Sequence, residues 1–180
     1  MIKTYFYIFF IFCTSCQLSP KDKPLPEVTY LDGLTTAKKI NCSSNKALHC
    51  MACALQGEAA NQNAQGVYAV GITIMTRAKG KLNKVCKVTK ARGQFEGMRR
   101  SGYRKISKKI WKITNHIIEK KETGWTHFWA PVEQKNLNRR KPAWASHFEQ
   151  RQCLKEKIDD HIFYNKNKCT YKKIRENASN

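Results

Sequence analysis

The residue with the clearest chemical potential is Glu58, which ends the apolar stripe of a predicted helix over Ala47–Ala60. The stripe follows from three- and four-residue steps between apolar positions, which are Leu48, Met51 and Leu55. Glu58 is the next position at that spacing, so we expect its carboxyl group on the buried face. A carboxyl group against an apolar surface keeps its proton more readily than a solvated one, which suits a general acid. The alternative is a boundary residue that extends to water.

Glu58 is also isolated along the chain. No other Asp or Glu occurs between Asp32 and Glu96, although Lys and Arg are frequent on both sides. A second feature with chemical potential lies at the end of that interval, where Arg92–Gly97 combines polar and aromatic side chains between glycines. Loops of this kind often carry binding groups on a rigid scaffold.

The overall charge limits the classes of partner. The 180-residue chain has a formal net charge of +21, which attracts polyanions such as nucleic acid, anionic lipid or the acidic polymers of a bacterial envelope. The length suits one domain with a proper core and short appendages. Its aromatic content favours a folded body over a disordered basic tail.

The N-terminus indicates export. Met1–Lys3 supplies a positively charged start, and the apolar run Tyr5–Phe12 is too short for a permanent membrane helix, as in a signal peptide. The run ends near Cys16 in a pattern that resembles the lipobox of bacterial lipoproteins, with ordinary signal cleavage as the alternative. We expect lipidation of Cys16, a tether over residues 17–36, a catalytic domain over 37–170 and a polar tail over 171–180. Gln17 favours the outer membrane where an organism has two membranes.

Export changes the interpretation of the cysteines. With Cys13 removed and Cys16 lipidated, an even number remains, and disulfides are the default in an oxidising compartment. Their pairing stays open. A metal site built on His49, Cys50 and Cys53 is the alternative, although no second cysteine pair at ligand spacing supports it. We expect no metal and no cofactor.

The remaining chain predicts mainly helices followed by β structure. A helix apolar on nearly all sides is expected over Ala64–Ala78, and an amphipathic helix over Tyr103–Glu122. The interval Gly80–Gly102 between them is expected to be loop-like, with room for short helical turns. Two short aromatic runs, Trp125–Trp129 and Ile158–Tyr164, could pair as an antiparallel ribbon.

Seven segments in order resemble the bacterial cell-wall hydrolase family of the spore-cortex-lytic type. The matching segments are Leu55–Ala59, Gly66–Val70 with Arg77, Cys86–Val88, Gln94–Phe95, Thr126–Pro131, Pro142–Ala145 and His161–Tyr164. The resemblance implies an α+β fold: a mainly helical, lysozyme-like domain with a small antiparallel β ribbon in its C-terminal part. It also implies cleavage of peptidoglycan glycan strands between N-acetylmuramic acid and N-acetylglucosamine.

In that family the Glu of the Gly-Glu-Ala motif is the catalytic acid, which places the role on Glu58. A lytic transglycosylase needs one carboxylate because the C6 hydroxyl of muramic acid is the nucleophile, whereas an ordinary glycosidase uses two. Glu96 is the candidate second acid. We expect glycan contacts from Gln94 and Phe95, and either substrate contacts or scaffold roles for His127 and His161.

Three other functions are weighed against this enzyme. One is a non-catalytic, peptidoglycan-binding envelope lipoprotein. Binding to nucleic acid fits the charge but not export. A phage lysis enzyme falls within the same enzyme class. The choice between hydrolysis and transglycosylation stays open.

Overall fold

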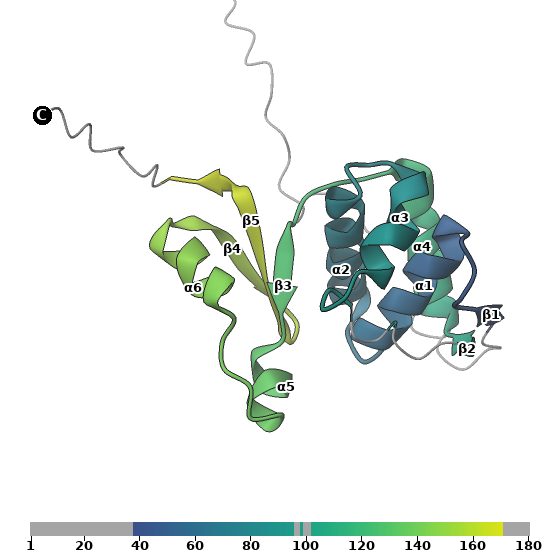
Figure 1. Cartoon of the computed structure of the whole chain (residues 1–180), viewed down its shortest axis with the longest axis horizontal. Coiled ribbons are helices and arrows are strands. Elements are labelled where there is room, and N and C mark those ends of the chain that lie inside the picture. Colours follow the sequence, from purple (N-terminus) through teal and green to yellow (C-terminus); the bar gives the residue numbers. More distant parts are fainter. Residues whose placement is uncertain (1–37, 96–97, 99–101, 171–180) are drawn as a thin grey trace, which may run out of the picture.

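The computed structural model describes residues 38–95, 98 and 102–170. The predicted signal peptide with Cys16, the tether over 17–36, Glu96 and the tail over 171–180 therefore lie outside the described residues. The architecture is α+β, as predicted from the sequence. Four helices form one body, and a three-stranded sheet with two further helices lies beside it (Figure 1).

The helical body is built around α2 (Ala64–Arg77), which is buried from Gly66 to Met75. Its near-complete burial follows from the apolar side chains on all its faces, as the sequence predicted. α1 (Ala47–Glu58) and α4 (Lys108–Lys120) pack against it, and α3 (Leu82–Lys90) contacts both α1 and α2. At Gly71 a Cβ atom would lie 2.3 Å from Cδ1 of Ile117, so this glycine permits the close approach of α4.

Two local predictions were wrong. The interval Gly80–Gly102 contains the nine-residue helix α3 and not only loop. The helix expected over Tyr103–Glu122 is divided into strand β2 (Tyr103–Ile106) and helix α4, because the Ser107 hydroxyl accepts a hydrogen bond from the backbone N–H of Ile110 and starts the helix there.

The strands form two antiparallel sheets. β1 (Lys38–Asn41) pairs with β2, and the second sheet has the order β3-β5-β4, with β3 (His127–Trp129), β4 (Cys153–Ile158) and β5 (His161–Cys169). The predicted ribbon is confirmed by the pairing of His127 with Tyr164 and of Trp129 with Ile162. β4 was not predicted.

Two short helices flank this sheet. α5 (Pro131–Asn136) directly follows β3 and has no buried residue, and α6 (Ala143–Gln150) packs on β4 and β5. The Pro142–Ala145 segment lies at the start of α6, with Pro142 immediately before the helix. The sheet joins the helical body through a shared core that includes Phe163 and Ile158.

Three disulfides hold these parts together: Cys42–Cys53, Cys50–Cys86 and Cys153–Cys169. Cys50–Cys86 joins α1 to α3, and Cys153–Cys169 joins β4 to β5. The alternative metal site is therefore wrong, because both of its cysteine ligands are in disulfides. Within the described ranges, no helix is long and apolar enough to cross a membrane.

Candidate active site

Glu58 is the last residue of α1, at the point where the helix leaves the core. Leu55 and Ala59 are fully buried, Gly57 is exposed, and Glu58 itself is half-buried. The predicted burial of this carboxyl group was therefore too complete, because Glu58 is only half-buried. Core residues stand on both sides of Glu58 along the chain, but Glu58 itself lines a cavity.

The cavity next to Glu58 has a volume of about 520 Å³, within the range of small-ligand sites. Its walls come from the end of α1, the turn before α2, the region of α5 and the β4–β5 turn. The lining residues are Gly57, Glu58, Ala60, Asn61, Gln62, Ala130, Val132, Glu133, Asn136, Asp160 and His161. We refer to it as the Glu58 pocket.

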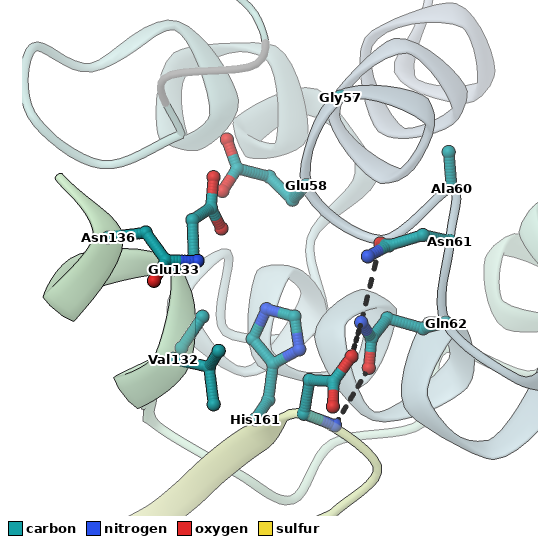
Figure 2. Close-up of a pocket in the computed structure, with 11 residues that line it drawn as sticks. Gly57, Glu58, Ala60, Asn61, Gln62, Val132, Glu133, Asn136 and His161 are labelled. Carbon is teal, nitrogen blue, oxygen red and sulfur yellow. Dashed lines mark hydrogen bonds between the residues drawn. The ribbon is translucent and has the colours of Figure 1, made fainter.

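Two other carboxylates line the Glu58 pocket. Glu133 comes from α5, and Figure 2 shows its carboxylate turned toward that of Glu58. Asp160 lies on the opposite wall, at the β4–β5 turn. The isolation of Glu58 along the sequence is thus not isolation in space, because the fold brings acids from positions 133 and 160 into the same cavity.

Gln62 fixes the wall opposite α5. Its side-chain amide donates to Asp160 Oδ2 at 3.2 Å and its Oε1 accepts from the Asp160 backbone N–H at 3.1 Å (Figure 2). Next to it, the Asn63 backbone N–H donates to Asp159 Oδ2 at 2.7 Å. These bonds join the α1–α2 turn to the β4–β5 turn. Asp160 therefore has a positioning role that leaves Glu58 and Glu133 as the carboxylates facing the cavity.

His161 follows that turn and is only 3% exposed. Its ring packs edge-on against Phe128 with 5.2 Å between ring centroids. Its Nδ1 is buried and has no hydrogen-bond partner within the described part of the chain. Burial lowers the pKa of His161, which favours a neutral ring. A neutral imidazole with an unpaired nitrogen at a cavity wall can exchange a hydrogen bond with a ligand.

The other predicted site residues lie elsewhere. Phe95 is 2% exposed and packs on Phe128, so its ring contacts protein side chains and is not presented to a sugar. Gln94 and His127 line a second cavity near the end of α2. Of the other predicted site residues that the structure describes, only His161 joins Glu58 in the Glu58 pocket.

Comparison with known protein families adds an independent observation. The family model described as Cell Wall Hydrolase matches residues 61–164, more than half of the chain. The chain belongs to the cell wall hydrolase family. The comparisons with curated proteins and with solved structures returned no match.

The matched range of this cell wall hydrolase includes Glu133 and His161 but begins three residues after Glu58. Sequence reasoning missed Glu133, although one signal was present: it stands just after the Thr126–Pro131 motif, where Pro131 begins α5. A carboxylate in the first turn of a helix that follows a family motif merits consideration as a site residue.

The charged environment of His127 predicts a pH dependence of stability for this cell wall hydrolase. Burial, followed by the charges of Arg77 and Lys166, lowers the pKa of His127 from 6.5 to about 4. Unfolding therefore takes up a proton between these two values. The free energy of unfolding should fall as the pH drops through this window, by on the order of 1–2 kcal/mol after screening by solvent is allowed for.

His127→Gln should reduce that slope in urea unfolding experiments between pH 7 and pH 4.5. His161, whose pKa is also lowered, keeps part of the slope in the variant. Glu149 does not contribute to this slope. Its pKa is lowered from 4.5 to about 2, mainly by the hydrogen bond from Lys141, so the stability that it provides is lost only as the pH falls below 4.5. Identical slopes of unfolding free energy against pH for the wild-type protein and His127→Gln would contradict the prediction.

Proposed function

We propose that this cell wall hydrolase cleaves the glycan strands of peptidoglycan between N-acetylmuramic acid and N-acetylglucosamine, with Glu58 as general acid and base. The observation that supports the proposal most strongly is a half-buried carboxyl group in the wall of a cavity of about 520 Å³ that also holds the unpaired nitrogen of His161. The cavity is large enough for sugar rings on both sides of a cleaved bond.

In the transglycosylase form of the reaction, Glu58 donates its proton to the glycosidic oxygen. The bond from that oxygen to C1 of muramic acid breaks, and its electron pair stays on the leaving sugar. The C6 hydroxyl of the same muramic acid then attacks C1, and its proton returns to Glu58. One carboxylate thus serves both steps, and the product is a 1,6-anhydro sugar. His161 Nδ1 is suited to hold an acetamido or hydroxyl group during these steps.

Glu133 offers a second route. A glycosidase that uses water needs another carboxylate, either as nucleophile or to activate the water. Glu133 is the side chain in the Glu58 pocket that faces Glu58, whereas Asp160 is engaged by Gln62. We infer that Glu133 is the second acid if the enzyme is a hydrolase; the earlier candidate, Glu96, lies outside the described residues and stays a prediction.

Glu133→Gln tests this distinction. If the reaction is transglycosylation, the variant should keep activity within about threefold, because the C6 hydroxyl needs no second carboxylate. If the reaction is hydrolysis, the variant should lose activity by about 10²–10⁴-fold, the usual contribution of a general base. The measurement is the initial rate of muropeptide release, with Asn136→Ala as a control for disturbance of the pocket wall.

The activity itself is tested by dye release from labelled, purified peptidoglycan. The wild-type protein should release dye and Glu58→Gln should not. Binding of both proteins without release from either would move the conclusion to the non-catalytic, peptidoglycan-binding lipoprotein.

We further propose that the enzyme acts from a membrane anchor. The family's substrate lies in the envelope, and the lipobox-like sequence before Cys16 would attach the chain to lipid through the tether at residues 17–36. About 20 extended residues span roughly 60 Å, enough to place the domain away from the membrane. Metabolic labelling with palmitate should mark the wild-type chain but not Cys16→Ala; equal labelling would reject the anchor.

A further inference from the structure

A second cavity, separate from the Glu58 pocket, lies between the end of α2, α3 and the start of β3. Its volume is about 490 Å³, and it is lined by Arg77, Lys84, Lys87, Val88, Ala91, Gln94 and His127. We refer to it as the Arg77 pocket. No residue is shared with the Glu58 pocket, and no Asp or Glu is among its described lining residues. Three cations therefore surround it without a carboxylate.

Arg77 is fixed in place but not neutralised. Its Nε donates to the Thr126 backbone carbonyl at 2.8 Å, and its Nη1 donates to Gln94 Oε1 at 2.5 Å. The guanidinium carbon lies 5.5 Å from the centre of the Phe95 ring. Both acceptors are neutral, and within the described ranges Arg77 pairs with no carboxylate. Three of the five N–H donors of a guanidinium thus remain for a ligand.

The surroundings keep this pocket positive. Burial lowers the pKa of Arg77 to about 10, so the guanidinium is still charged at neutral pH. His127 stays neutral, in part because of the charge on Arg77. Lys84 and Lys87 are exposed and lie three residues apart on α3, so they project from the same side of the helix. Gln94, whose oxygen faces Arg77, keeps its amide N–H groups as donors.

We propose that the Arg77 pocket binds a free carboxylate of the peptidoglycan stem peptide. A planar guanidinium matches a carboxylate with two parallel hydrogen bonds, and flexible lysines at the rim add charge. The pocket is a second contact with the substrate, away from the cleaved bond. It gives Gln94 and His127 a role in binding the peptide in place of the sugar contacts expected from the sequence.

One strand connects the two cavities. His127, the first residue of β3, lines the Arg77 pocket, and Ala130, just after the strand, lines the Glu58 pocket. The two positions are three residues apart, roughly 10 Å along an extended chain. Because successive side chains of a strand point to opposite faces, these two side chains leave opposite faces, and the Arg77 pocket is a contact away from the cleaved bond.

The test compares two double variants in full-length protein that also carries Glu58→Gln, so that the substrate stays intact. Lys84→Gln with Lys87→Gln alters the Arg77 pocket; Lys105→Gln with Lys108→Gln removes the same charge from exposed positions that line neither pocket. Cosedimentation with purified sacculi should show at least tenfold weaker binding for the first pair and less than twofold for the second. Sacculi whose carboxylates are chemically amidated should bind the two double variants with equal affinity.

Two results would overturn the proposal. Equal losses for the two double variants would mean that bulk charge alone drives binding. A difference that persists on amidated sacculi, but disappears when phosphate polymers are stripped with hydrofluoric acid, would assign the pocket to phosphate instead. The proposal rests on peptidoglycan as the substrate and not on Glu58 as the catalyst, so it can stand or fail separately from the dye-release experiment.

Discussion

Glu58→Gln is expected to reduce the rate of muropeptide release by about 10²–10⁴-fold, the contribution usual for a positioned general acid. Gln is close in size to Glu and can still form hydrogen bonds, but it has no proton to give to the glycosidic oxygen. Glu58 is half-buried at the end of α1, so the substitution should leave the fold intact. The measurement is the initial rate with purified peptidoglycan, together with the thermal unfolding midpoint.

Glu119→Gln is a matched control for this substitution. Glu119 lies on α4 with 72% of its side chain exposed, and it lines neither pocket. The control should retain full activity at an unchanged unfolding midpoint. Activity of Glu58→Gln within threefold of wild type would exclude Glu58 as the acid and direct attention to Glu133.

Removal of the Cys50–Cys86 disulfide is expected to have the largest effect on stability. The bond joins residues 36 apart, and the loop-closure model assigns about 4 kcal/mol to a loop of that length. Cys50 is fully buried in the same core as Leu55, and Leu55 lies one turn before Glu58. Loss of the disulfide should therefore also loosen the helix that positions the acid. Urea unfolding of Cys50→Ala with Cys86→Ala measures the change.

The Cys153–Cys169 pair provides the comparison. Its sequence separation is 16, for which the same model assigns about 3 kcal/mol. The pair holds β4 to β5, away from α1. We therefore expect its removal to reduce activity less than removal of Cys50–Cys86. A loss below about 1 kcal/mol for the Cys50–Cys86 variant would contradict the expected stabilisation of the helical body.

The features that sequence reasoning predicted well depend on local pattern. α2 was predicted at nearly its observed bounds because every face of Ala64–Ala78 is apolar, which only a buried helix can satisfy. The pairing of β3 with β5 followed from two short aromatic runs. The spacing of three apolar residues assigned Glu58 to the first helix, although that helix ends at Glu58 and not at Ala60.

The features that were missed depend on contacts between distant parts of the chain. Tyr103–Ile106 has a helix-compatible pattern, but pairing with Lys38–Asn41 makes it a strand. β4 has three charged residues in a row, Lys155–Lys157, and forms because β5 is available beside it. Glu133 enters the Glu58 pocket only because β3 directs α5 toward the end of α1.

The most direct test of the account is the mass of the products released from purified peptidoglycan by the wild-type protein. Disaccharide-peptides that end in muramic acid, absent with Glu58→Gln, are the expected result. Anhydro ends would indicate transglycosylation, whereas ends heavier by one water would indicate hydrolysis with Glu133 as the second acid. Free peptides released from intact glycan strands would contradict the account, because the bond broken would then be an amide and not the glycosidic bond assigned to Glu58.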